Sequence, residues 1–331
     1  MINLKNKKAV FKKINTITKL FNLSAYELLA VIYNLKPAMA EANTGVYDSS
    51  SSEKLDQLGR ICSELGLKMA FSQKKYIINS PRGIFEEVEL NSPEDGNLVI
   101  GISKDIQTSL SAVAHYRWKM KDSIYGRSFG KLMGYPDCCL DFGDYLCKGH
   151  GDSNSNNLGF RNPAVESLKR SKKVAWQLNI FVASALPHYP CHLNCNKSKD
   201  YVNGLFEILK IAAPEIYLRH TMMLKNDISL YWSCADKVVF HGHFIKKGNS
   251  FADTEAQYNS ADFHINSSTF YQANSDSYLN QLEVIKQAIK EGDKIITTPK
   301  YFEIRHSKTV LLKINKSHEL IPVLLKSDNE K

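Results

Sequence analysis

The stretch Gly134-Tyr-Pro-Asp-Cys-Cys-Leu-Asp-Phe142 carries two adjacent cysteines shortly after a proline. Proline is tolerated in the first turn of a helix, where its missing N–H group would have no partner in any case, so we expect a helix that runs from here to about Leu146. Cys138 and Cys139 then lie in the first turn. Unpaired N–H groups and aligned peptide dipoles at a helix start favour the thiolate form of cysteine, which is the form that binds metals.

A second motif, Pro190-Cys-His-Leu-Asn-Cys195, precedes another predicted helix. Its two cysteines have the spacing of one zinc knuckle and can bring both sulfur atoms to one ion. Adjacent cysteines on a helix diverge by about 100°. We therefore expect only one of Cys138 and Cys139 to reach the ion, while the other packs in the core. His188 and His192 flank the second motif as nitrogen ligands in reserve.

These motifs predict a Cys/His metal site formed by two helix N-termini, which binds zinc or an iron–sulfur cluster. Zinc is favoured for a structural site because it accepts mixed sulfur and nitrogen ligands in tetrahedral geometry. A four-sulfur site and a site of three sulfurs with one histidine both fit. An incompletely ligated ion would leave a position open for catalysis, although no substrate is evident. The radical S-adenosylmethionine pattern is excluded, since position 198 is Ser. The candidate ligands are Cys138, Cys139, Cys191, Cys195, His188 and His192.

Two other classes of function fit the sequence. The first is a metal-free thiol enzyme in which Cys138 or Cys191 is the nucleophile. The second is a module that binds RNA or another polyanion through Lys5 to Lys19 and Lys169 to Lys173, with a metal that is only structural. The formal charge of +9 favours the second class, but only eight of the 43 basic residues are Arg, which weakens it. An anionic substrate could also bind beside the motifs, at Arg127, Lys131, Lys197 and Lys199.

The two motifs, together with an early Leu35-Lys36-Pro37, resemble an uncharacterised family of archaeal and bacterial proteins classed as a domain of unknown function. The resemblance covers roughly residues 25 to 245. It rests on Gly134-Tyr-Pro-x-Cys-Cys-x-x-Phe142 and on His188-x-Pro-Cys-x-x-x-Cys-x-x-Ser198. It implies metal binding by cysteines, and residues 150–160 look like an insertion relative to the family pattern.

Composition and periodicity predict an α+β fold in three parts. Residues 1–96 form an N-terminal mixed α/β unit, residues 97–225 a central, mainly helical domain that carries the cysteine motifs, and residues 226–331 a β-rich C-terminal domain, where the hydrophobic period changes from 3.6 to 2. Helices are expected over 10–21, 25–34, 50–65, 103–121, 162–185, 196–212 and 277–290, and strands over 75–79, 97–102, 228–233, 237–245, 301–305 and 309–314.

The composition, with 43% apolar and 23% charged residues, is that of a globular chain and excludes a disordered or fibrous one. No apolar run approaches the roughly 18 residues of a membrane span. We expect a cytoplasmic protein with reduced thiols, since the seven cysteines are an odd number and no export signal is evident.

The remaining cysteines and histidines are expected to be mainly structural. Cys62 lies in the apolar stripe of a predicted helix, and Cys147 and Cys234 stand alone in the sequence. His241 and His243 share one face of a predicted strand, which is a geometry that can bind a metal, but a half-exposed strand is the more ordinary interpretation. His115 is also expected to be structural.

Overall fold

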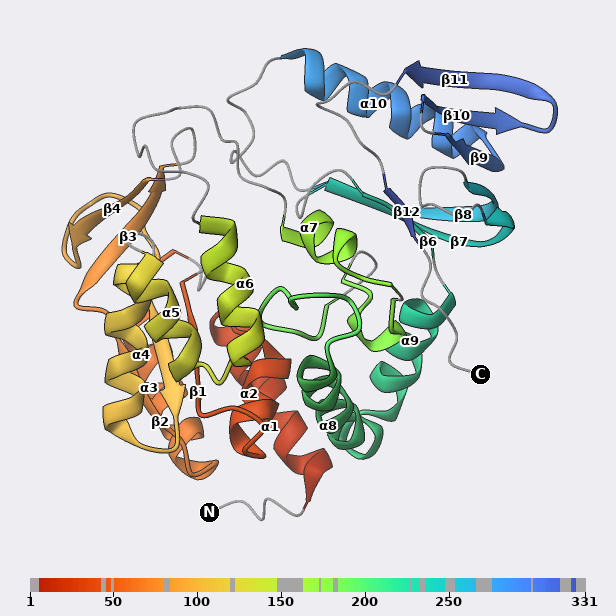
Figure 1. Cartoon of the computed structure of the whole chain (residues 1–331). Helices are drawn as coiled ribbons and strands as arrows, with labels where there is room; N and C mark the ends of the chain where they lie inside the picture. The colour runs from red at the N-terminus through yellow and green to blue at the C-terminus, as the bar shows by residue number, and fades with distance from the viewer. Residues whose placement is uncertain are drawn as a thin grey trace. The chain divides into compact units, whose positions relative to one another are not determined.

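The computed structural model describes residues 6–42, 46–48, 51–79, 84–119, 123–147, 163–172, 174–180, 184–226, 228–231, 236–247, 254–265, 276–298, 300–315 and 323–325. The fold is α+β, as the sequence predicts (Figure 1). The chain divides into two compact units. The first comprises Met1–Asn79, Gly83–Pro163 and Ala185–Leu218, and the second comprises Ser80–Arg82, Ala164–Ser184 and Arg219–Lys331.

A small antiparallel sheet lies in the first unit, with β5 (Ile100–Ser103) between β1 (Ala38–Glu41) and β2 (Lys68–Phe71). Helix α4 (Ile106–Lys119) packs on all three strands. Gly101 makes this approach close, because a Cβ atom there would lie 2.6 Å from the Ser109 carbonyl oxygen. The boundary expected between residues 96 and 97 therefore falls within one unit, since β5 completes a sheet that begins with β1.

Side chains cap the first two helices of the first unit. Asn6 accepts a hydrogen bond from the Ala9 N–H at the start of α1, and Ser24 accepts one from the Glu27 N–H at the start of α2. Helix α1 packs against α2, α3 and α8. The helices and the hairpin of this unit are α1 (Lys7–Leu20), α2 (Ala25–Ile32), α3 (Ser51–Glu64), α5 (Ser123–Leu132), α6 (Asp137–Cys147) and α8 (Asn196–Ala212), with β3 (Lys74–Asn79) and β4 (Ile84–Glu89).

Seven of the described strands form one antiparallel sheet in the second unit, in the order β11-β10-β9-β8-β7-β6-β12. Helix α10 (Asp276–Glu291) packs against β8, β10 and β11, and Ile285, Ile289, Ile295 and Phe302 are buried in the core between helix and sheet (Figure 1). The strands are β6 (Ile228–Tyr231), β7 (Asp236–Lys247), β8 (Thr254–Ile265), β9 (Lys294–Thr297), β10 (Tyr301–His306), β11 (Thr309–Asn315) and β12 (Val323–Leu325).

The long helix expected over residues 162–185 is wrong. Helix α7 (Pro163–Lys169) is short, because Ser171 closes its last turn: its N–H donates to the Leu168 carbonyl and its hydroxyl to the Ser167 carbonyl. A 3-10 turn, η1 (Trp176–Leu178), follows. Another helix was not expected: α9 (Pro214–Asn226) begins at the proline that ends α8. No helix in the described part of the chain is both long and apolar enough to cross a membrane.

Candidate metal centre

A tight turn between α5 and α6 places the first cysteine pair. Gly134 ends α5 with φ of +75°, and a Cβ atom there would lie 2.7 Å from Cδ of Pro37, so both the backbone conformation and the packing require glycine. The carbonyl oxygen of Pro136 then accepts hydrogen bonds from the N–H groups of Cys139 and Leu140, which starts α6. The cysteine pair lies in the first turn of this helix, as predicted.

The second cysteine motif forms the entry to α8. Cys195 is the N-cap residue of this helix, and its carbonyl oxygen accepts a hydrogen bond from the Lys199 N–H at 2.9 Å. The Cys195 N–H donates to the His192 carbonyl oxygen at 3.1 Å, which closes the turn between the two cysteines. At the other end of this turn, the Cys191 N–H points to the sulfur of Cys139 at 3.4 Å. The two motifs therefore meet directly.

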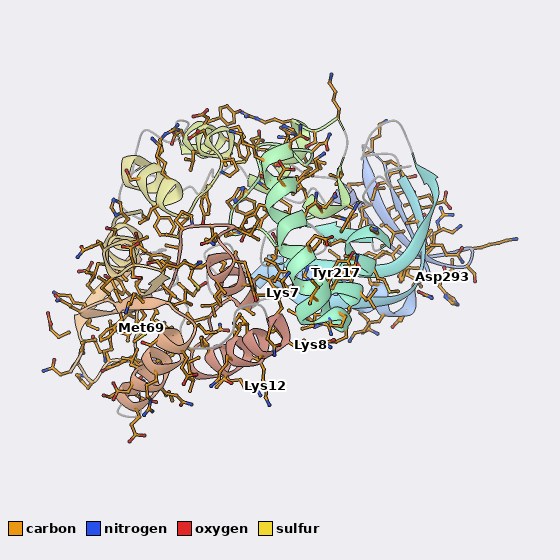
Figure 2. The ribbon with its side chains drawn as sticks, turned by 90° about the horizontal axis from the view of Figure 1, so that it is seen from below. Lys7, Lys8, Lys12, Met69, Tyr217 and Asp293 are labelled. Carbon is orange, nitrogen blue, oxygen red and sulfur yellow. The ribbon has the colours of Figure 1, made fainter. Side chains whose placement is uncertain are left out.

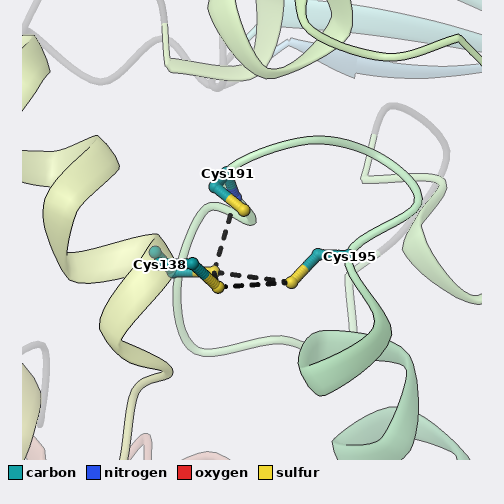
Figure 3. Close-up of side chains that lie close together, drawn as sticks. Cys138, Cys191 and Cys195 are labelled. Carbon is teal, nitrogen blue, oxygen red and sulfur yellow. Dashed lines mark hydrogen bonds between the residues drawn. The ribbon is translucent and has the colours of Figure 1, made fainter.

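The sulfur atoms of Cys138, Cys139, Cys191 and Cys195 all lie within 4.8 Å of one another. The Cys138 and Cys195 sulfurs are 3.7 Å apart, and the Cys139 sulfur lies 4.0 Å from each of them. Figure 3 shows the Cys138, Cys191 and Cys195 side chains pointing toward a common centre. Cys139 and Cys195 are buried, Cys138 and Cys191 are half-buried, and all four are free thiols. This cluster could hold a metal ion.

Both Cys138 and Cys139 belong to the cluster, although only one of them was expected to reach the site; whether each sulfur binds an ion stays a prediction. The 100° divergence describes directions around the helix axis. Each Cα–Cβ bond also tilts toward the N-terminus of the helix. In the first turn no preceding turn stands in the way, so both thiols can lean past the end of α6 toward the same point.

Contacts between the thiols, together with burial, shift the pKa values of the cluster's cysteines in different directions. A hydrogen bond from the Cys139 thiol, with further ones from Ser198 and Cys138, lowers the pKa of Cys195 to about 4. The same contact with Cys195, together with burial, raises the pKa of Cys139. Burial is the main cause that raises the pKa of Cys191 to about 12. Cys191 thus does not have the lowered pKa that its place before a helix suggested.

Neither flanking histidine is among the four residues of the cluster. Nε2 of His188 lies 3.1 Å from the Ser198 hydroxyl, and that hydroxyl lies 3.5 Å from the sulfur of Cys139. His188 is thus a neighbour of the cluster through Ser198. Nδ1 of His192 accepts a hydrogen bond from the Asn194 N–H at 3.3 Å, which fixes it within the turn. Ser198 is part of the second motif but was not proposed as a site residue; its position three residues after the N-cap places it beside the cluster.

Several basic residues proposed for anions are engaged with acidic or aromatic partners. Arg127 forms ion pairs with Asp141 and Asp144 of α6, at 2.9 and 2.5 Å. Lys13 pairs with Glu64 at 2.8 Å. In addition, Lys169 pairs with Glu166 at 2.8 Å, and the ammonium of Lys7 lies 5.7 Å from the centre of the Tyr33 ring. Figure 2 shows Lys7, Lys8 and Lys12 along α1. Lys5 and Lys173 lie outside the described residues.

Two of the isolated cysteines and histidines are structural. Cys62 is buried in α3, and burial raises its pKa to about 12. Nδ1 of His115 lies 2.8 Å from the Ser111 carbonyl oxygen, within the same helix. The predictions for the other four concern side chains outside the described part of the structure: Cys147, Cys234, His241 and His243. No family model matches this chain, and neither curated proteins nor solved structures gave a match.

Proposed function

We propose that this protein binds a single zinc ion through Cys138, Cys139, Cys191 and Cys195, and that the ion is structural. The separation of the sulfur atoms carries the proposal. Zinc–sulfur bonds of about 2.3 Å in a tetrahedron place neighbouring sulfurs about 3.8 Å apart. The separations among the Cys138, Cys139 and Cys195 sulfurs, 3.7, 4.0 and 4.0 Å, are close to that edge length, and the Cys191 sulfur lies within 4.8 Å of each of them.

The same separations favour one ion over an iron–sulfur cluster. In a cluster the cysteines bind different iron atoms that are bridged by sulfide, so the protein sulfurs of a four-iron cluster lie further apart than the ligands of one ion. A single iron in a four-sulfur site has similar geometry to zinc, and metal analysis separates the two. The resemblance of both motifs to the archaeal and bacterial family adds support for cysteine-based metal binding.

Four sulfur ligands fill the tetrahedron of a zinc ion. A catalytic zinc keeps one position for water or substrate, whereas a structural zinc has four protein ligands. We therefore assign the ion the task of joining the start of α6 to the start of α8, rather than activating a substrate. The partly exposed Cys138 and Cys191 give the ion a path from solvent.

Metal analysis of anaerobically purified protein, together with its absorption spectrum, tests the proposal. We expect about one zinc per chain, as a four-ligand structural site requires, and no visible absorption. A metal content below about 0.2 per chain, with four freely titratable thiols in the cluster, would overturn it. If the protein contains iron and shows visible absorption bands, the metal of the site is iron rather than zinc.

The alternative of a metal-free thiol enzyme predicts different alkylation behaviour. A nucleophilic thiol would be labelled rapidly in metal-free protein at neutral pH, because only the thiolate reacts. The bound ion protects all the thiols of the cluster until a chelator removes it. Burial raises the pKa of Cys191 to about 12, which disfavours this residue as the nucleophile.

A further inference from the structure

The two cysteines of the first motif differ in how well an oxidant from solvent reaches them. Cys138 is half-buried, and among the described residues its sulfur is hydrogen-bonded only to other thiols. Cys139 is buried, and its sulfur accepts a hydrogen bond from the Cys191 N–H and lies 3.5 Å from the Ser198 hydroxyl. Oxidation of a cysteine follows the exposure of its sulfur, so Cys138 is attacked before Cys139.

The nearby thiols are not equivalent as disulfide partners of Cys138. Adjacent Cα atoms across a trans peptide lie about 3.8 Å apart, below the roughly 4.4 to 6.8 Å that a disulfide spans, which disfavours Cys139. The Cys195 sulfur is in contact with that of Cys138 at 3.7 Å, and the two side chains point toward each other (Figure 3). The backbone N–H of Cys191 points instead to the sulfur of Cys139. Cys195 is therefore the best-placed partner.

We propose that Cys138 and Cys195 form a reversible disulfide when a hydroperoxide oxidises the cluster, and that this disulfide releases the zinc ion. With hydrogen peroxide, the Cys138 thiolate attacks the O–O bond, which breaks to give a sulfenic acid and hydroxide. The Cys195 thiolate then attacks the sulfenic sulfur and displaces a second hydroxide. The two thiolates together lose two electrons, and one peroxide is reduced.

The disulfide changes what holds the two helix starts together. Only the sulfurs of Cys139 and Cys191 remain for the ion, fewer than the four ligands of a structural zinc. Cys138 lies in the first turn of α6 and Cys195 is the N-cap of α8, so the covalent bond joins the same two helices after the ion leaves. Release of the ion rests on the proposed zinc site, whereas the disulfide needs only the two thiols.

The test titrates the anaerobically purified full chain with hydrogen peroxide at neutral pH. A chromogenic chelator measures the released zinc, and mass spectrometry with peptide fragmentation identifies the disulfide after the free thiols are blocked. We expect about one zinc ion released for each peroxide consumed, and a Cys138–Cys195 link. Cys62, which is buried in α3, should remain a free thiol. Dithiothreitol followed by zinc should restore the starting protein, because a disulfide is reduced by thiol exchange.

Two variants of the second motif form a matched pair. Cys191→Ala and Cys195→Ala each remove one sulfur of the cluster, but only Cys195→Ala removes the partner of Cys138. Peroxide should still give the disulfide in Cys191→Ala. In Cys195→Ala the disulfide should be lost, and Cys138 should proceed to the sulfinic acid that dithiothreitol does not reverse. If either variant fails to fold, fragmentation of the unchanged protein still identifies the linked pair.

Three results would overturn the proposal. They are a disulfide that joins other members of the cluster, sulfinic acid at Cys138 of the unchanged protein without a disulfide, and zinc that stays bound once the Cys138–Cys195 link has formed. A chain purified without zinc would refute the metal site and the release of the ion, while the same sample still shows whether the disulfide forms.

Discussion

Replacing one sulfur of the cluster tests the metal site most directly, and Cys138→Ala is the most informative change. Cys138 is half-buried, so truncation of its side chain alone should cost no more than about 1 kcal/mol. Structural zinc supplies about 10 to 16 kcal/mol through four ligands, which is about 2.5 to 4 kcal/mol for each sulfur. Because that energy is folding energy, we expect Cys138→Ala to lower the free energy of unfolding by about 4 kcal/mol.

The control is Cys62→Ala, which removes a fully buried thiol of α3 that lies outside the cluster. It should cost about 1 kcal/mol. Urea unfolding of both variants and of the unchanged protein gives the free energies, with and without a strong chelator. The chelator should destabilise the unchanged protein and Cys62→Ala alike, and bring Cys138→Ala to within about 1 kcal/mol of them.

The reasoning is refuted if Cys138→Ala costs no more than Cys62→Ala without chelator, or if the chelator leaves the unchanged protein as stable as before. Since Cys139, Cys191 and Cys195 share the cluster, their alanine variants should lose as much stability as Cys138→Ala does. A small loss in one member of the first pair would favour the other site that the sequence allows, with three sulfurs and one histidine.

Three further predictions concern the surroundings of the site. Gly134→Ala should lower the thermal midpoint, with a cost of about 2 kcal/mol, because φ is positive there and the added Cβ atom would clash with Pro37. Gly143→Ala is the control: an added Cβ atom in α6 meets no atom within 4 Å, so this variant should raise the midpoint slightly. Lys36→Met should lower the free energy of unfolding in urea by about 3 kcal/mol, because it leaves the carboxylate of Glu27 without its buried ammonium partner at 2.5 Å. Adding Glu27→Leu should recover part of this loss. If the double variant recovers nothing, Lys36 and Glu27 do not act as an ion pair. Cys62 should resist alkylation by iodoacetamide at pH 8 in the folded protein, as read by mass spectrometry, because burial raises the pKa of its thiol to about 12. Since this pKa in the folded protein lies above the ordinary value, the contribution of the neutral thiol to stability is present at neutral pH and is lost as pH rises from about 9 to about 12.

Local chemistry made much of the fold predictable. Apolar periodicity gave α1, the cap at Ser24 gave α2, and the proline at position 136 gave α6, because its missing N–H group suits the first turn of a helix. With α8, which was expected after the second cysteine motif, these predictions located the two helix ends that carry the cysteines to within a few residues.

Contacts between segments that lie far apart in the sequence determine the features of the fold that the sequence did not predict. Strands β1 and β2 have four residues each, too few for a periodic pattern, and they exist because β5 pairs with both. The apolar residues after α7 have helical spacing, yet Leu178 is buried from a 3-10 turn. Likewise, the convergence of Cys138 and Cys139 depends on where the partner motif lies, which their spacing does not contain.

The two halves of the cysteine cluster are far apart along the chain, with Cys139 and Cys191 separated by 52 positions. An ion held by both halves would act as a reversible cross-link across that distance. By the loop-closure relation, a covalent link over such a length lowers the entropy of the unfolded chain by the equivalent of about 4 kcal/mol. Because this quantity grows only with the logarithm of loop length, the segment between the motifs could lengthen by a dozen residues with little change in what the cross-link contributes. The site thus leaves the intervening chain free to vary in length during evolution while the two helix starts stay joined.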